Sequence, residues 1–132
     1  MALRAQYHFR PGPQGLQAWD VRRLVTLAAP LAPRWVPLSA IAELDEPYWF
    51  SEHDPRPTTR ALAEHMRLVQ QADTAYPIVL CAEGRVMDGM HRVVRRLLDG
   101  HDTVLAVQFA ATPPPDHPDA DPDTLPYDDQ DD

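Results

Sequence analysis

The spacing of apolar and polar residues predicts two amphipathic helices in the first part of the chain. Asp20 can cap a helix whose apolar residues recur at helical spacing and which ends at Pro30. Thr58 can cap a second helix that runs to about Gln71. The second helix is expected to bury Leu62, Met66 and Val69 and to expose Arg60, Glu64, Arg67 and Gln71.

Short extended segments are expected before and between these helices. A strand is predicted at Gln6–Phe9, ahead of the run Pro11–Pro13, which a helix or a central strand would not tolerate. Trp35–Leu38 forms another short extended run. Ser39 can then cap a turn or two of helix that reaches Leu44.

Residues 77–109 carry the clearest pattern. An apolar strand at Pro77–Cys81 is followed by a tight turn, a strand at Arg85–Met87, a helix at Gly89–Leu98 and a strand at Thr103–Phe109. This helix is expected to bury Met90, Val93, Val94, Leu97 and Leu98 and to hold Arg95 and Arg96 in solvent. The pattern predicts an α+β fold, with a small mixed β-sheet and flanking helices.

The chain of 132 residues is 44% apolar, which is enough for one domain with a hydrophobic core. Its formal net charge of -8 is unevenly distributed, because eight of the twenty acids lie beyond residue 115. Six prolines and little apolar sequence accompany them. We therefore expect a single domain at residues 1–111 and a disordered acidic tail at residues 112–132.

Composition also narrows the classes of partner. Without the tail, twelve acids balance twelve arginines, so the domain lacks the basic face that duplex DNA binding requires, and the sequence disfavours a nucleic-acid partner. No apolar run approaches the length of a membrane span, and no secretory leader pattern opens the sequence. We expect a cytoplasmic protein with no membrane association.

The turn that opens the last predicted helix carries candidate chemistry. In the sequence DGMHR, residues 88–92, an Asp-Gly turn leads directly into Met90, His91 and Arg92. The first N–H groups of a helix have no partners within it, so they favour an anion, and an arginine adds a charge-assisted bond to phosphate. The alternative is that Asp88 caps these groups itself and that His91 packs at the edge of the core.

The run YPIVLCAEGRVMDGMHRVVRRLLDGHDTVLAVQF resembles the ParB/sulfiredoxin-like fold, and WVPLSAIAEL and RALAEHMRLVQQA are similar to the strand and helix that precede it there. The resemblance covers about Trp35–Phe109 and extends to small bacterial proteins of this fold. It implies a nucleotide-phosphate site at Gly89, Met90, His91 and Arg92, because members bind ATP, ADP or CTP phosphates at this helix start. The expected ligand is a nucleotide or another phosphorylated small molecule.

Two branches of this family fit the sequence poorly. Sulfiredoxin has its catalytic cysteine in a G-C-H-R element, where this chain has Met90. Partition proteins have a G-E-R-R element where this chain has Gly-Met-His-Arg, and they continue into a helix-turn-helix domain where an acidic tail is expected here. The sequence thus disfavours both sulfinic acid reduction and a partition-type role on DNA.

A third branch, the free-serine kinases, implies transfer of a phosphoryl group from ATP with Mg²⁺ to a small molecule. Asp88 is the candidate metal ligand, and Glu43, Asp45 or Glu46 is the candidate base. Each of these three acids could instead be a solvated helix end. The aromatic loop Tyr48–Asp54 could close over a substrate or only anchor itself.

Two hypotheses of different kinds therefore remain. The first is an enzyme, either a small-molecule phosphotransferase or a nucleotide hydrolase. The second is a non-catalytic module in which nucleotide binding, or no ligand at all, controls association with a protein partner.

Overall fold

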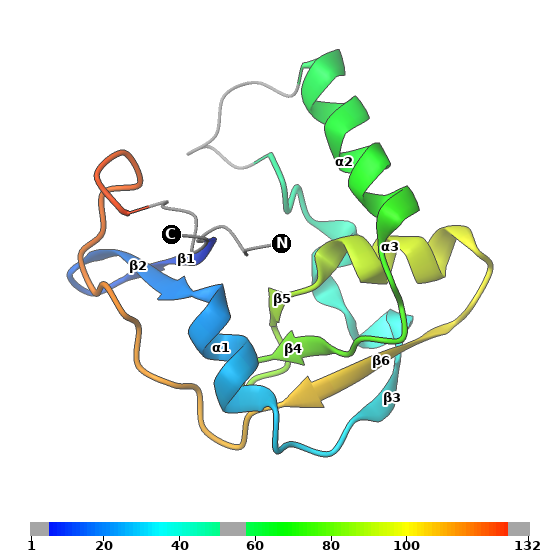
Figure 1. Cartoon of the computed structure of the whole chain (residues 1–132), viewed down its shortest axis with the longest axis horizontal. Coiled ribbons are helices and arrows are strands. Elements are labelled where there is room, and N and C mark those ends of the chain that lie inside the picture. The colour runs from blue at the N-terminus through cyan, green and yellow to red at the C-terminus, as the bar shows by residue number, and fades with distance from the viewer. Residues whose placement is uncertain (1–5, 51–57, 127–132) are drawn as a thin grey trace, which may run out of the picture.

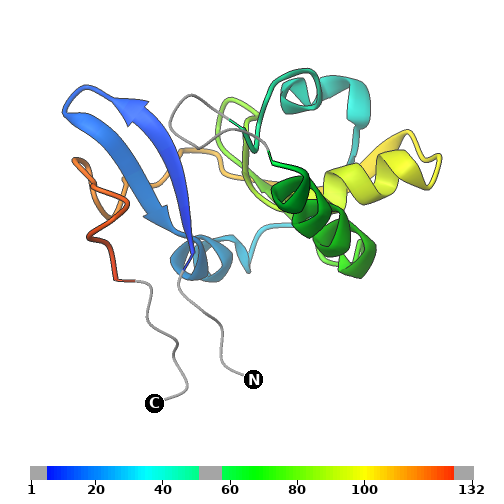
Figure 2. The same cartoon turned by 90° about the horizontal axis from the view of Figure 1, so that it is seen from above.

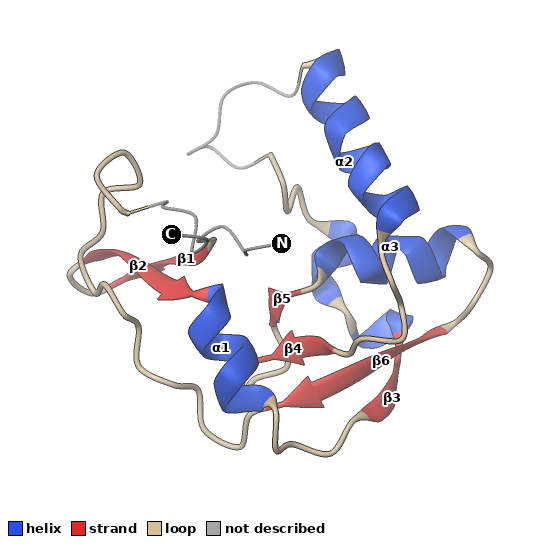
Figure 3. Cartoon of the chain, in the orientation of Figure 1, coloured by secondary structure: helices blue, strands red, loops and turns tan. Residues whose placement is uncertain are grey.

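The computed structural model describes residues 6–50 and 58–126 of the chain. Helices and strands are mixed along it, which confirms the predicted α+β class (Figure 3). In chain order the elements are β1 (Tyr7–Gly12), β2 (Gly15–Asp20), α1 (Val21–Ala28), β3 (Arg34–Pro37), the 3₁₀ turns η1 (Leu38–Ala40) and η2 (Ala42–Asp45), α2 (Thr59–Gln71), β4 (Ile78–Leu80), β5 (Val86–Asp88), α3 (Met90–Leu98) and β6 (Thr103–Gln108).

The main sheet has four strands in the order β3-β6-β4-β5 (Figure 1). β4 and β6 run parallel, with α3 on the connection between β5 and β6, while β3 and β5 pair antiparallel at the two edges. The sheet is therefore mixed, as the pattern of residues 77–109 predicts.

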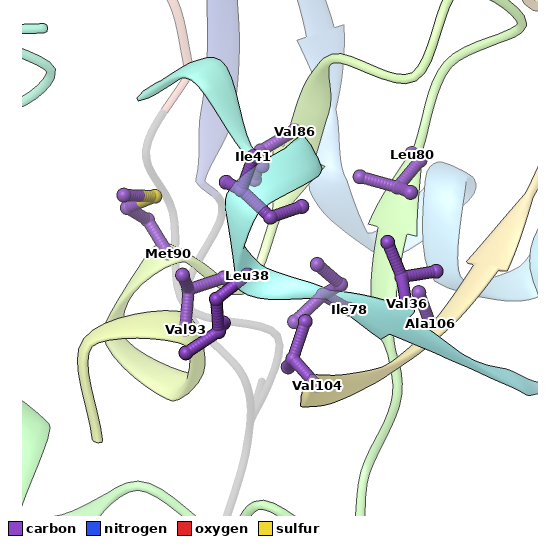
Figure 4. Packing of buried hydrophobic residues seen from close by; sticks show 10 residues of the cluster. All are labelled: Val36, Leu38, Ile41, Ile78, Leu80, Val86, Met90, Val93, Val104 and Ala106. Atoms are coloured by element: carbon purple, nitrogen blue, oxygen red, sulfur yellow. The ribbon is translucent and has the colours of Figure 1, made fainter. Parts of the chain in front are cut away.

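Both faces of this sheet are buried, because successive side chains of a strand point to opposite faces. One face packs against α3 and the η1–η2 segment, and Figure 4 shows this cluster, made of Val36, Leu38, Ile41, Ile78, Leu80, Val86, Met90, Val93, Val104 and Ala106. The other face packs against α1 and the end of β2, through Trp19, Leu24, Ala28, Val79, Cys81, Met87, Val107 and Phe109. Burial on both sides explains the continuous apolar run of β4.

β1 and β2 form a separate antiparallel hairpin, which lies to one side of the main sheet (Figure 2). The predicted strand at Gln6–Phe9 is too short, since β1 continues through Pro11 to Gly12. Proline is tolerated there because a two-stranded ribbon has only edge strands. Gly15 starts the return strand with φ of +129°, in the region that favours glycine.

Residues 112–126 follow a defined path along this hairpin, although the sequence predicts a disordered tail from residue 112. The indole N–H of Trp19 donates to the carbonyl of Pro113 at 2.7 Å, and Ala18 pairs with His117 through two backbone hydrogen bonds. Asp116 accepts from the backbone N–H of Asp20 at 2.7 Å and pairs with Arg23 at 2.8 Å. The edge of β2 thus supplies partners that compensate for the scarcity of apolar side chains in this segment.

The predicted helix caps had different outcomes. Asp20 caps α1 through the N–H of Arg22, and Thr58 caps α2 through the N–H of Ala61, as predicted. The prediction for Ser39 was wrong, because η1 begins after Pro37 and has no side-chain cap.

Two predicted buried faces also needed correction. In α2 only Val69 is buried, while Leu62 and Met66 are exposed, because α2 packs mainly on α3 and on Trp49 through His65. In α3 the residues Leu97 and Leu98 are exposed, since they lie in the last turn, where the helix ends at the surface.

Arg95 and Arg96 were predicted to extend into solvent, but both side chains are bonded to the protein. Arg95 donates to the carbonyl of Gln70 at 2.6 Å, and Arg96 donates to the carbonyl of Thr103 at 2.8 Å and lies over the ring of Trp35. None of the helices in the described ranges combines the length and the hydrophobicity that a bilayer crossing requires.

Candidate active site

The buried carboxylate of Glu43 is the most unusual polar group in the domain. It lies in η2 at 2% exposure, and its Oε2 accepts from the backbone N–H of Val86 at 2.7 Å and lies 3.3 Å from Nε of Arg85. Its Oε1 is buried without a hydrogen-bond partner. Leaving such an atom unpaired costs about 1–3 kcal/mol, which marks Glu43 as a candidate functional group.

The other two acids named as candidate bases differ from Glu43. Asp45 is exposed. Glu46 is exposed too, and both of its oxygens receive hydrogen bonds from Arg85, at 2.6 and 3.0 Å. These bonds lower the pKa of Glu46, so it remains ionised and already paired. Of the three acids, only Glu43 combines burial with an unpartnered oxygen.

The Asp88–Arg92 turn is held together by its own charges. Arg92 pairs with Asp88 at 3.0 Å and donates to the carbonyls of Pro77 at 2.6 Å and Tyr76 at 3.3 Å. Gly89 precedes α3 with φ of +104°, and a Cβ built on it would lie 2.7 Å from Cγ2 of Ile78. Only glycine fits this close approach.

No side chain caps the start of α3, so Asp88 does not have the capping role considered as the alternative. Met90 is 6% exposed. Figure 4 shows its side chain in the core cluster, so only its backbone can face a ligand. The turn therefore brings together Asp88, Gly89 and Arg92 while it directs Met90 inward.

His91 belongs to a stack of three rings. The ring of Trp49 lies 4.7 Å from that of His91 and 4.2 Å from that of His65, and the two histidines share a hydrogen bond of 2.9 Å between Nδ1 of His65 and Nε2 of His91. Burial, followed by the charges of His65 and Arg92, lowers the pKa of His91 to about 4. His91 is thus neutral near pH 7 and has no positive charge to offer a phosphate.

A cavity of about 820 Å³ lies beside Glu43, between the hairpin and the η2–β5 region of the core. Its size falls within the range typical of small-molecule sites. The hairpin side of the cavity is lined by Tyr7, His8, Phe9, Arg10, Pro11 and Leu16, with Pro122 of the following segment. The core side is lined by Glu43, Glu46, Pro47, Tyr48, Trp49, Arg85 and Val86.

Arg10 is a half-buried residue that also lines this cavity and has one buried nitrogen without a partner. Its Nε donates to His8 at 2.8 Å, and its guanidinium lies 5.6 Å from the centre of the Trp19 ring. One terminal nitrogen is buried without a partner. Burial and the charge of Arg10 lower the pKa of His8 to about 3. His8 therefore stays neutral, and the positive charge of Arg10 is not balanced by it.

Tyr48 lies on the core side of the cavity, close to both predicted parts of the site. Burial raises the pKa of Tyr48 to about 12, and the negative charges of Glu43 and then Asp88 add to this shift. The phenol therefore keeps its proton and can donate a hydrogen bond. The rest of the predicted loop, residues 51–54, lies outside the described residues.

Sequence reasoning missed Arg10, His65 and Trp49 as parts of these clusters. Alternation in the strand sequence YHFRPG places His8 and Arg10 on one face of β1, and this signal could have identified Arg10. No local signal pairs His65 with His91, because they lie on different helices. Within residues 6–50 and 58–126, no three His, Cys, Asp or Glu side chains come together as metal ligands would.

The chain was compared with protein-family models, with curated proteins and with solved structures, and no match was found in any of the three comparisons.

Proposed function

We propose that this domain transfers a phosphoryl group from a nucleotide to a small molecule held in the cavity, with Glu43 as the general base. The observation that carries the proposal is that Glu43 lines that cavity and that its buried Oε1 has no hydrogen-bond partner. A general base must lie within hydrogen-bond reach of the proton that it removes. An acceptor hydroxyl in the cavity would give this oxygen its missing partner.

The proposed reaction is an in-line phosphoryl transfer. The acceptor hydroxyl gives its proton to Glu43 while its oxygen forms a bond to the terminal phosphorus of the nucleotide. The bond from that phosphorus to the bridging oxygen breaks, and the nucleoside diphosphate leaves. Tyr48, which stays protonated, would donate a hydrogen bond to the acceptor.

The phosphate half of the proposal is supported by the resemblance of residues 35–109 to the ParB/sulfiredoxin-like fold and by the uncapped start of α3. Arg92 would bind phosphate in place of its present partner, Asp88. The charges would stay balanced, because Asp88 would then face the cation that accompanies the nucleotide.

The turn fits Mg²⁺ that arrives with a nucleotide. Asp88 offers one hard carboxylate ligand, and Mg²⁺ is commonly held by one or two carboxylates together with phosphates and water. When bound, Mg²⁺ neutralises charge that develops on the phosphates. The turn does not fit a metal held by protein ligands alone, since the described residues form no three-ligand cluster.

The test is a comparison of Glu43→Gln with the matched variant Glu46→Gln. Each protein is titrated with ATP and CTP in the presence of Mg²⁺, and phosphoryl transfer to a panel of small hydroxyl compounds is followed by nucleoside diphosphate release. We expect Glu43→Gln to keep nucleotide binding and to lose turnover by a factor of about 100 or more, while Glu46→Gln retains both. Equal turnover in the two variants would exclude Glu43 as the base.

One observation favours a second candidate, a non-catalytic binding module. Arg92 is engaged by Asp88 and by two carbonyls, which suits a purely structural turn. In that case nucleotide or another ligand would change association with a protein partner without turnover. Arg92→Ala distinguishes a phosphate site from a purely structural turn. If the turn is structural, the variant loses stability and the affinity for every nucleotide is unchanged. If the turn binds phosphate, the variant loses nucleotide affinity.

A further inference from the structure

The cavity beside Glu43 is lined by groups of opposite charge on its two sides. The hairpin side contributes the guanidinium of Arg10, which has a buried nitrogen without a partner. The core side contributes the carboxylate of Glu43, which has a buried oxygen without a partner. Polar groups buried in this way are normally satisfied, so each points to an interaction that a ligand would complete.

The Arg10 side calls for an anion. Among the residues that the structure describes, no carboxylate forms an ion pair with Arg10, and its one side-chain hydrogen bond goes to neutral His8. A guanidinium binds a carboxylate through strong, charge-assisted hydrogen bonds. The stacking of Arg10 on Trp19 holds the group in place for such a contact.

The Glu43 side calls for a hydrogen-bond donor. Arg85 and the N–H of Val86 both approach Oε2, which leaves Oε1 as the acceptor atom in need of a donor. A second anionic group would be repelled there, so the ligand must be polar but not negative at this end.

The surface between these two ends is mostly apolar and rich in aromatic rings. Tyr7, Phe9 and Leu16 come from the hairpin, and Tyr48 and Trp49 come from the core. Rings of this kind favour an apolar, planar ligand body over a highly hydrated one.

We propose that the cavity binds a small aromatic hydroxy acid, with its carboxylate on Arg10 and its hydroxyl on Glu43. The inference deepens the proposed function, because it names the class of acceptor, and it rests on that function only for the fate of the hydroxyl. Arg10 lies outside the part of the chain that resembles the ParB/sulfiredoxin-like fold, so the hairpin is the element that selects this ligand.

The experiment measures binding of three probes by calorimetry in the absence of nucleotide. 4-Hydroxyphenylacetate has both polar ends, phenylacetate lacks the hydroxyl, and 4-methylphenol lacks the carboxylate. We expect 4-hydroxyphenylacetate to bind at least about tenfold more tightly than either of the others.

Variants assign each end of the probe. Arg10→Gln should weaken 4-hydroxyphenylacetate about tenfold or more and leave 4-methylphenol unchanged. Glu43→Gln should weaken the two hydroxyl probes and leave phenylacetate unchanged. The matched control is Arg60→Gln, on the exposed side of α2, which should bind all three as the wild type does.

A blocking variant guards against loss of binding through misfolding. Leu16→Trp fills the hairpin side of the cavity while Arg10 and Glu43 stay in place, so it should abolish binding of every probe with an unchanged far-ultraviolet circular dichroism spectrum and an unchanged urea midpoint. Binding that survives this change would place the ligand elsewhere and overturn the inference.

The inference and the proposed function fail in different ways. Equal affinity for the three probes, no binding at millimolar concentration, or an Arg10→Gln effect that is the same for 4-methylphenol would overturn the inference. Binding as expected with no phosphoryl transfer from any nucleotide would leave the inference standing and overturn the proposed function.

Discussion

The carboxylate of Glu43 accepts a hydrogen bond of 2.7 Å from the backbone N–H of Val86, which fastens the η2 turn to the edge strand β5. β5 leads directly into the Asp88–Arg92 turn. Glu43, the proposed base, is therefore bonded to the strand that leads into the predicted phosphate turn. Its structural role can be separated from its chemical role by substitution.

Replacing Glu43 by Ala should lower the free energy of unfolding by about 1–3 kcal/mol, because the buried N–H of Val86 loses its acceptor. Glu43→Gln keeps an acceptor oxygen and should lose much less. Urea denaturation followed by circular dichroism measures both. Asp45→Ala is the control, since Asp45 is exposed and its loss should change stability by less than about 0.5 kcal/mol. Equal losses for Ala at both positions would contradict the role of this bond.

Gly89→Ala and Gly100→Ala form a matched pair that separates backbone conformation from steric contact. Both glycines have positive φ, but a Cβ at Gly89 would lie 2.7 Å from Ile78, while none of the described atoms lies within 4 Å at Gly100. We expect Gly100→Ala to cost about 1–2 kcal/mol and Gly89→Ala to cost at least about 1 kcal/mol more. Chemical denaturation curves give the comparison, and a smaller loss at Gly89 would mean that β4 relaxes freely.

The ring stack predicts how stability changes with pH. Burial lowers the pKa of His91 to about 4 in the folded protein, below the usual value of 6.5, with contributions from His65 and Arg92 and an opposing one from Asp88. The unfolded chain therefore binds more protons at this residue between pH 6.5 and 4. Stability should be fully present above pH 6.5 and should fall as the pH falls toward 4.

His91→Phe is the variant that tests this pH dependence, because it keeps a ring beside Trp49 and removes the titrating group. The slope of unfolding free energy against pH between 6.5 and 4.5 should become shallower in the variant. A residual slope is expected, since burial and the charge of Arg10 lower the pKa of His8 to about 3 in the same direction. Identical slopes in the two proteins would show that His91 does not contribute.

The contact between residues 112–126 and the hairpin should depend on Asp116. Asp116→Ala removes the acceptor for the N–H of Asp20 and the partner of Arg23, so we expect a loss of about 1–2 kcal/mol in unfolding free energy. Tryptophan fluorescence should also change, because the N–H of Trp19 donates to the carbonyl of Pro113. Asp123→Ala, at an exposed position of the same segment, is the control, and a shift of equal size there would point to net charge as the cause.

Short-range patterns in the sequence were enough to predict much of the fold. The apolar runs at Pro77–Cys81 and Thr103–Phe109 become β4 and β6, and the caps at Asp20 and Thr58 lie where they were expected. Caps and side-chain periodicity depend on residues only a few positions apart, so the sequence shows them directly.

The candidate site depended on tertiary packing. Three acids within four residues look alike in the sequence, and only contact with β5 and Arg85 separates buried Glu43 from Asp45 and from paired Glu46. In the same way, the motif DGMHR did not reveal that Arg92 would pair with Asp88 or that His91 would stack on Trp49.

The sequence by itself thus determined the α+β class, the order of elements from β4 to β6 and two of the helix caps, because these follow from local conformational preferences. Only the tertiary structure decided that residues 112–126 lie along the hairpin, that Leu62 and Met66 are exposed, and that Arg10 and Glu43 line one cavity. These features join residues far apart in the chain, and their energies arise from burial and pairing that exist only after the elements have packed.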